Sequence, residues 1–318
     1  MSGSVLPRFG LGAAPLGNLF TEVDDVTARD CVDAAWDAGI RYFDTAPHYG
    51  LGLSERRLGD ALRGRARDEV VVSTKVGRLL EPDPDWRPGR DDSANGFHVP
   101  ATLRRRPDLT PTGVRRSLVE SVGRLGLDRV DVALLHDPEE IGTPEEARAA
   151  VSTLRELRTE GVVRAVGAGS KSAAALEDLV RAGGLDVVML AGRYTLLEQE
   201  AARGLLDLCA ERGVAVIAVG VLNSGLLATA RPAPGATYEY GPAGREVLDR
   251  AHRLADVCEE HGVTLPHAAV HFPLRHPAVV NVTVGLRSRR EVAELAHWVS
   301  TPVPEELWAA LDAVGGPR

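Results

Sequence analysis

VVVSTKV, at residues 70–76, decides the fold class, because it opens with three consecutive β-branched residues that no polar residue interrupts. A strand of this kind is typical of a parallel sheet that helices cover on both faces. VAVIAV, at residues 214–219, has the same character. Short β-branched segments recur along the chain on either side of these two runs. The pattern predicts eight strands: 9–14, 41–45, 70–76, 130–136, 163–168, 187–191, 214–219 and 279–284.

Segments with the period of a helix separate the predicted strands. In residues 112–127 the apolar residues recur at spacings of three and four and so share one helix face (Val114, Leu118, Val122, Leu125). Eight strand-helix units predict an α/β TIM (β/α)8 barrel, a single domain over residues 1–318. A doubly wound open sheet is the alternative. It would need fewer strands, and the early glycines lack the spacing of a dinucleotide-binding fingerprint (Gly10, Gly12, Gly17).

The composition indicates a globular chain and excludes several classes of protein. Of the 318 residues, 44% are hydrophobic and 26% are charged, a balance that supports a full core. The net charge of −8 repels a phosphate backbone, so nucleic acid is not expected as a partner. No apolar run reaches the ~20 residues of a membrane span, and no signal-like stretch opens the chain, so we expect no membrane partner and a cytoplasmic location. The cysteines fall in helical segments without metal-ligand spacing, which predicts buried thiols (Cys31, Cys209, Cys258).

One segment breaks the alternation of strands and helices. Residues 78–110 contain five prolines and no periodic pattern (Pro82, Pro84, Pro88, Pro100, Pro107). A connection this long is normally a functional loop or a disordered one. It follows the third strand, on the face where barrel enzymes build their sites, so we expect it to cover a ligand. We expect a second, smaller flap at residues 231–241.

Polar side chains gather at the ends of the predicted strands, where a barrel places its functional site. Asp44 is near the end of the second strand, and Tyr49 follows five residues later. Lys75 is near the end of the third strand and His136 ends the fourth. Among 37 basic residues only Lys75 and Lys171 are lysine, so this sequence uses the ammonium group sparingly.

These four residue types suit proton transfer to or from a carbinol oxygen. A tyrosine phenol has an ordinary pKa of about 10, and a nearby ammonium favours the phenolate and lowers that pKa. Asp44 can hold Lys75 in place and keep it charged, while His136 can donate a hydrogen bond to a carbonyl oxygen. Each residue alone also fits a structural role, as a buried ion pair or a core histidine. The four together favour catalysis.

Two other classes of function remain open. A metal-dependent barrel hydrolase could use Asp44, His48, His136 and Asp137 as ligands, but the paired-histidine motif of such enzymes is missing from the early strands, so we expect no metal. A regulatory protein could keep the barrel and bind a nucleotide without turning it over. A regulatory protein would not need all four of the polar residues that suit catalysis, so their presence together argues against that class.

The same residues carry a family resemblance. DTAPHYGLGLSE at residues 44–55, together with STK at 73–75, resembles the aldo-keto reductase superfamily. Four further segments are similar to the branch that contains L-fucose dehydrogenase, D-threo-aldose 1-dehydrogenase and pyridoxal 4-dehydrogenase: PLGNL (15–19), LLHDP (134–138), GRYTLL (192–197) and NSGL (223–226). The resemblance implies hydride transfer with a nicotinamide cofactor. It assigns Tyr49 as general acid or base, Lys75 and Asp44 as the pair that tunes it, and His136 as the residue that orients the substrate.

The resemblance also implies where the cofactor binds. The turn after the seventh strand would hold the pyrophosphate (Gly220, Leu222, Ser224). The segment after the eighth strand would hold the adenosine half (Gly285, Arg287, Glu291, Glu294). Ser288, in that segment, is a good N-cap and predicts the start of a helix whose N–H groups and dipole suit a phosphate.

Three positions depart from the family pattern. Val219 stands where many members stack an aromatic residue on the nicotinamide, and Gly169-Ser170 replaces the pair that usually holds the carboxamide. Glu291 stands where NADP-using relatives often have a basic residue. A carboxylate repels a 2′-phosphate but can accept a hydrogen bond from a ribose hydroxyl, so NAD is the expected cofactor and NADP the alternative.

The expected reaction is oxidation of the anomeric hydroxyl of an aldose, such as L-fucose or D-arabinose, to its lactone. Oxidation of pyridoxal and general aldehyde or ketone reduction are the alternatives. Polar residues of the loops are the candidates for binding a sugar (His48, Trp86, His98). The sequence carries no signal for the oligomeric state.

Overall fold

The computed structural model describes residues 6–199 and 202–315. Its centre is a closed barrel in which every neighbouring pair of strands is parallel. The barrel closes where the first strand pairs with the last, with Phe9 opposite Val282. In order around the barrel the strands are β1 (Phe9–Gly12), β14 (Val279–Gly285), β11 (Ala215–Val219), β10 (Val187–Ala191), β9 (Ala165–Ser170), β8 (Val132–His136), β3 (Val71–Val76) and β2 (Tyr42–Asp44).

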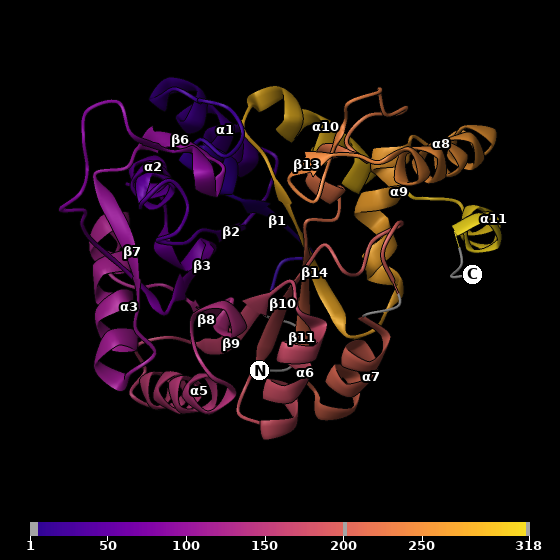
Figure 1. Ribbon diagram of the computed structural model, residues 1–318. Coiled ribbons are helices and arrows are strands. Elements are labelled where there is room, and N and C mark those ends of the chain that lie inside the picture. The colour runs from indigo at the N-terminus through magenta and orange to yellow at the C-terminus, as the bar shows by residue number, and fades with distance from the viewer. Residues whose placement is uncertain (1–5, 200–201, 316–318) are drawn as a thin grey trace.

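Helices surround the barrel strands, as Figure 1 shows. Glycines in the left-handed conformation end several of them, as at Gly126 and Gly213, because this conformation is unfavourable for residues with a Cβ atom. The helices are α1 (Asp25–Asp37), α2 (Leu53–Leu62), α3 (Pro111–Leu125), α4 (Pro138–Ile141), α5 (Pro144–Thr159), α6 (Ala173–Ala182), α7 (Arg203–Arg212), α8 (Arg245–Glu260), α9 (Leu265–His271), α10 (Arg289–Ser300) and α11 (Glu305–Gly315).

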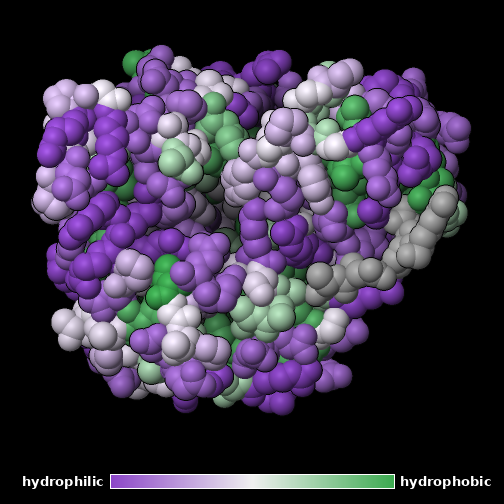
Figure 2. Space-filling model, viewed as in Figure 1, coloured by the Kyte–Doolittle hydropathy of each residue, from purple (hydrophilic) through white to green (hydrophobic). Residues whose placement is uncertain are grey.

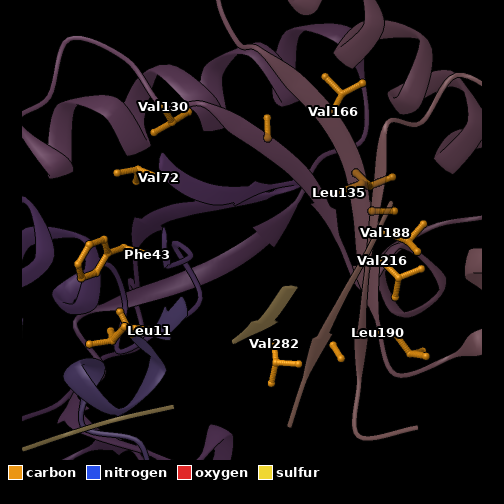
Figure 3. Packing of buried hydrophobic residues seen from close by; sticks show 14 of the residues in the cluster. Leu11, Phe43, Val72, Val130, Leu135, Val166, Val188, Leu190, Val216 and Val282 are labelled. Carbon is orange, nitrogen blue, oxygen red and sulfur yellow. The ribbon is translucent and has the colours of Figure 1, made fainter. Parts of the chain in front are cut away.

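Both faces of the barrel strands are buried, which explains their unbroken apolar runs. Successive residues of a strand point to opposite faces. Tyr42 and Ile217 therefore belong to the cluster inside the barrel, while their neighbours Phe43 and Val216 belong to the cluster between the barrel and the helices. Figure 3 shows the second cluster arranged around the strands. Burial on both faces holds the strand ends in fixed positions, and those ends carry the polar residues of the site.

The eight predicted strands and the TIM barrel are confirmed, with small differences at the strand ends. Residues 78–110, in which the sequence shows no pattern, contain regular structure. β4 (Arg78–Pro82) pairs antiparallel with β7 (Leu103–Pro107), and β5 (Asp91–Asp92) pairs antiparallel with β6 (Phe97–Pro100). Prolines end three of these strands, at positions that a two-stranded sheet tolerates. The long connection therefore contains two small antiparallel sheets.

The predicted flap at residues 231–241 overlaps another small sheet, in which β12 (Thr237–Tyr238) pairs with β13 (Gly241–Pro242). On the face shown in Figure 2, hydrophilic residues predominate and apolar residues form only small separate areas. Within residues 6–199 and 202–315, no helix has the length and apolar character that crossing a membrane requires.

The cysteines are buried, free thiols in α1, α7 and α8, as predicted. Burial raises the pKa of each thiol to about 12, so all three stay protonated at neutral pH (Cys31, Cys209, Cys258).

Candidate active site

A buried ion pair joins the ends of β2 and β3. Lys75 Nζ donates to Asp44 Oδ2 at 2.6 Å and to the Thr45 carbonyl at 3.0 Å. Ser73 Oγ donates to the other carboxylate oxygen of Asp44 at 2.7 Å. Burial alone would lower the pKa of Lys75, but the charges and hydrogen bonds of Asp44 and Tyr49 together raise it. Lys75 therefore carries its positive charge at neutral pH, as the sequence predicts.

Tyr49 lies in the loop after β2, with the Lys75 ammonium 4.6 Å from the centroid of its ring. The two side chains therefore face one another. Burial raises the pKa of Tyr49 to about 12, and the charge and hydrogen bond of Lys75 oppose that rise. The sequence-based expectation of a lowered pKa is therefore wrong, because loss of hydration outweighs the attraction of the ammonium. Tyr49 is a protonated phenol at neutral pH.

Two imidazoles complete this end of the site. His136, at the end of β8, has its ring centroid 5.9 Å from that of Tyr49 and 5.5 Å from that of His48. Burial, followed by the charge of Lys75, lowers the pKa of His136 well below its usual value. Burial, followed by the charge of Arg105, lowers the pKa of His48 to about 2. Both rings are therefore neutral, and each carries one N–H that can donate.

Two glycines fix the backbone of Tyr49 against the loop after β1. A Cβ atom on Gly50 would lie 2.3 Å from the Gly17 carbonyl oxygen, and a Cβ atom on Gly17 would lie 2.7 Å from the carbonyl carbon of Tyr49. Gly50 also has a φ of 59°, in the left-handed region. The contact between these two loops depends on the absence of side chains at both positions.

A cavity of about 440 Å³ runs from Asp44 and Tyr49 to α10. The loop after β11 forms one wall and the loop after β14 another. All seven predicted cofactor residues line it: Gly220, Leu222, Ser224, Gly285, Arg287, Glu291 and Glu294. Val219, which departs from the family pattern, also lines it, and so do Phe20, Tyr240 and Trp298.

Asn223 is a cavity residue that the sequence reasoning did not assign. It is 3% exposed, and among the described residues neither its Oδ1 nor its Nδ2 has a hydrogen-bond partner. An amide buried without partners is costly, so this one suits a ligand that supplies both a donor and an acceptor. Asn223 and Ser224 both have positive φ angles, of 46° and 58°. The NSG motif at 223–225 was the available signal, since asparagine and glycine favour such turns.

The end of the cavity where the sequence predicts the adenosine half is built around the start of α10. Ser288 caps this helix by accepting a hydrogen bond from the Glu291 N–H at 3.3 Å, as predicted. Glu291 in turn accepts from the Arg287 N–H at 2.8 Å and lies 3.2 Å from the Arg287 guanidinium. Arg290 and Glu294 form a looser pair at 4.0 Å. Each of these two arginines already has a carboxylate partner four residues later in the chain.

The predicted sugar-binding residues divide into two groups. His48 contacts the rings of Tyr49 and His136, so it lies at the site. Trp86 and His98 are not among the residues that line the cavity. The Trp86 indole donates within its own loop to the Arg90 carbonyl at 3.2 Å, while the backbone of His98 is hydrogen-bonded to Asn18. The Trp86 indole is thus engaged within its own loop, and His98 lies in β6, a strand that the sequence did not reveal.

Ser170, the other departure from the family pattern, is buried at the end of β9. Its hydroxyl donates to Glu139 and accepts from the Ser172 N–H at 2.7 Å. Ser170 is therefore engaged with neighbouring residues of the barrel rim.

The flap of residues 231–241 is tied to the barrel rim by its last residues. Glu239 accepts hydrogen bonds from Lys171 at 3.0 Å and from Arg193 at 2.9 Å, which follow β9 and β10. The Lys171 ammonium also lies 4.1 Å from the centroid of the Tyr240 ring. Tyr240 contacts Phe20, from the loop after β1, with ring centroids 5.5 Å apart. Because both aromatic rings line the cavity, this contact bridges two of its walls.

A metal centre does not fit this arrangement. The Asp44 carboxylate is bound to Lys75 and Ser73, so it is not available to coordinate a metal. Nowhere in the described part of the chain do three or more histidine, cysteine or acidic side chains form a group that could hold a metal ion.

Comparisons with known proteins agree with the geometry. The model of the Aldo/keto reductase family matches residues 8–315. A D-threo-aldose 1-dehydrogenase from a Pseudomonas species is 49% identical over 98% of this chain and 94% of that protein. The pyridoxal 4-dehydrogenase of Microbacterium luteolum is 35% identical over 99% of this chain and 95% of that protein.

The fold is also similar to a solved structure. The holo form of an aldo-keto reductase from Bacillus halodurans superposes with a TM-score of 0.77 at 25% identity, covering 99% of this chain and 95% of that one. The chain belongs to the aldo/keto reductase family. The resemblance inferred from the sequence is thus confirmed, and the protein is a nicotinamide-dependent oxidoreductase that acts on small molecules.

Proposed function

We propose that this protein is an NAD-dependent aldose 1-dehydrogenase, which oxidises the anomeric hydroxyl of a cyclic aldose to the lactone. The observation that carries the proposal is the Lys75 ammonium, held by Asp44 and facing the ring of Tyr49 at the end of the cavity. The relative that is 49% identical acts on aldoses, by its name.

The proton path follows from the residues at this end. The Tyr49 phenolate takes the proton of the anomeric hydroxyl, and Lys75 stabilises that phenolate by its charge. His136, as a neutral imidazole, donates a hydrogen bond that holds the reacting oxygen against Tyr49. A bound oxidised nicotinamide supplies the hydride acceptor. Asp44 keeps Lys75 in position throughout.

The cavity residues fit such a dinucleotide. The unpartnered amide of Asn223 offers both a donor and an acceptor, and the turn at Gly220 and Ser224 exposes backbone at the same wall. The start of α10 offers backbone N–H groups and a positive helix dipole to phosphate. NAD is preferred over NADP in this proposal, because Arg287 and Arg290 are already paired with Glu291 and Glu294, whose charges oppose a 2′-phosphate.

The imidazoles favour a ligand rich in hydroxyl groups. The Nδ1 atoms of both His48 and His136 are buried and have no hydrogen-bond partner in the described chain. A sugar offers hydroxyl groups that can satisfy buried polar atoms of this kind, whereas an apolar carbonyl compound cannot.

A spectrophotometric screen tests the proposal. L-fucose, D-arabinose, L-galactose and pyridoxal are each offered with NAD and with NADP. We expect at least one aldose to be oxidised, with a higher kcat/KM for NAD than for NADP. Turnover of pyridoxal alone would assign the second activity that the relatives suggest. Cofactor binding without turnover of any sugar or carbonyl would indicate a regulatory protein.

The pKa of Tyr49 predicts an opposite pH response in the two directions of the reaction. At neutral pH the phenol is protonated, because burial raises its pKa to about 12. Oxidation needs the phenolate, so kcat/KM for an aldose is expected to rise about tenfold per pH unit on the acid side of that pKa. Reduction uses the phenol, which is already fully populated, and is expected to vary little over the same range. Rate measurements from neutral to alkaline pH check this. A pH-independent oxidation rate would contradict Tyr49 as the base.

A further inference from the structure

Asp137 occupies an unusual place beside His136. It is the N-cap residue of the short helix α4, where an aspartate ordinarily accepts a hydrogen bond from the backbone of the first turn. The Asp137 side chain makes no such bond within the described chain. Its backbone has a φ of 43° and a ψ of 58°, in the left-handed region that is unfavourable for residues other than glycine. The Asp137 carboxylate is therefore not used to cap α4.

The carboxylate points toward the reacting end of the site instead. Asp137 Oδ2 lies 3.3 Å from His136 Nε2 and 3.4 Å from Arg78 Nη2. Its side chain is 24% exposed, so it is mostly shielded from water. Burial raises the pKa of both Tyr49 and Tyr240, which line the cavity, and the charge of Asp137 adds to each rise. Asp137 is thus next to the imidazole of His136 and acts on both phenols through its charge.

Arg78 holds the carboxylate from the other side. Its guanidinium is shared between Asp137 and Glu140, which lies 2.8 Å away and is largely exposed. Arg78 comes from β4, the first strand of the long connection after β3. The hydrogen-bonded β4–β7 sheet therefore fixes the side chain that positions Asp137.

We propose that Asp137 is a specificity residue for the substrate, whose carboxylate accepts a hydrogen bond from the hydroxyl on the carbon next to the reacting carbon. This inference rests on the proposed function, in which His136 holds the reacting oxygen. An acceptor 3.3 Å from the same imidazole is within reach of a hydroxyl on the neighbouring carbon. A carboxylate only accepts hydrogen bonds. A substrate with an alkyl group on the neighbouring carbon would therefore offer Asp137 no donor and lose this interaction.

The expected consequence is discrimination by hydroxyl content. A site that is built to bind a substrate hydroxyl rejects the analogue that lacks it more strongly than a hydrophobic pocket rejects a missing methylene. The protein should therefore prefer α-hydroxyaldehydes and aldoses over simple aldehydes of the same length. Asp137, rather than the apolar walls of the cavity, should carry most of that preference.

The test compares reduction of glyceraldehyde and of propanal by the wild type and by variants at Asp137, with the reduced cofactor as hydride donor. Asp137→Gly removes the carboxylate and accepts the left-handed backbone without strain, while Asp137→Asn keeps a neutral acceptor. We expect Asp137→Gly to lower kcat/KM for glyceraldehyde by about 10- to 100-fold and to change that for propanal by less than about threefold. Asp137→Asn should fall between the wild type and Asp137→Gly. Glu140→Gln, which alters the other partner of Arg78, is the matched control and should keep the wild-type ratio.

Three results would overturn the inference. The first is equal loss for both aldehydes, which would show that Asp137 acts only through His136 or Tyr49. The second is an unchanged ratio in Asp137→Gly, and the third is a wild type without preference for glyceraldehyde. Failure of the proposed function has a different readout, because in that case the wild-type protein oxidises no aldose. The ratio of the two aldehydes needs only carbonyl reduction and is unaffected by that outcome.

Discussion

Replacing Tyr49 by phenylalanine is expected to lower kcat for both oxidation and reduction by about 10² to 10⁴, because the variant lacks the group that carries the proton. The ring remains, so its contacts with Phe97 and His136 are kept and the fold should not change. Turnover is measured by the absorbance of the reduced cofactor, and thermal unfolding reports on the fold.

Tyr194→Phe is the matched control for this variant. Tyr194 packs against Phe272, with ring centroids 5.2 Å apart, and is not among the residues that line the cavity. Its loss of a hydroxyl should leave turnover unchanged. If Tyr49→Phe retained wild-type turnover in a folded protein, another group would have to transfer the proton.

Replacing Lys75 by methionine should damage both catalysis and stability. Without the ammonium the phenolate loses its stabilising charge, so turnover should fall by at least about 10². The Asp44 carboxylate is also left buried without its partner, which should lower the free energy of unfolding by about 3–5 kcal/mol. Denaturant unfolding and steady-state rates measure the two effects.

The double variant Asp44→Asn with Lys75→Met separates the two effects. A neutral amide at position 44 can still accept the hydrogen bond from Ser73, and no buried charge remains. We expect its stability to return close to that of the wild type, while its turnover stays as low as that of Lys75→Met. A double variant as unstable as Lys75→Met would show that the unpaired carboxylate is not the cause. Recovered turnover would show that the ammonium is not needed.

Much of the fold could be predicted because its signals are local. The β-branched and apolar residues of the runs at 70–76 and 214–219 predict parallel strands without any information from the rest of the chain. Both runs form strands of the barrel. The predicted catalytic residues meet for the same reason. Parallel strands of a barrel end on one face, so residues at the ends of β2, β3 and β8 must be neighbours. Residue type and strand position were sufficient to bring Asp44, Lys75 and His136 together.

The remaining features depend on contacts between distant segments. Trp86 and His98 are suited to a sugar by residue type, but the Trp86 indole donates to the Arg90 carbonyl of its own loop, and His98 lies in β6, whose pairing with β5 the sequence does not show. The Asn223 amide lacks partners among the described residues, a property of the folded chain that its residue type does not reveal. The pKa of Tyr49 rises because the surrounding loops exclude water, a quantity that residue types do not reveal. The fold class thus follows from the local pattern of β-branched and amphipathic segments. The pKa and hydrogen bonding of individual side chains follow from how the folded chain buries them.

Residues without a functional group are usually the easiest to replace, but the contact between Gly17 and Gly50 makes these two glycines hard to replace. Neither residue has a functional group, yet a single methyl group at either position would collide with backbone and shift the loop that carries Tyr49. Variants of this enzyme with new substrates are therefore expected to keep glycine at positions 17 and 50. The same constraint extends to the connection that follows β3, where Phe97 packs against the ring of Tyr49 with centroids 6.1 Å apart.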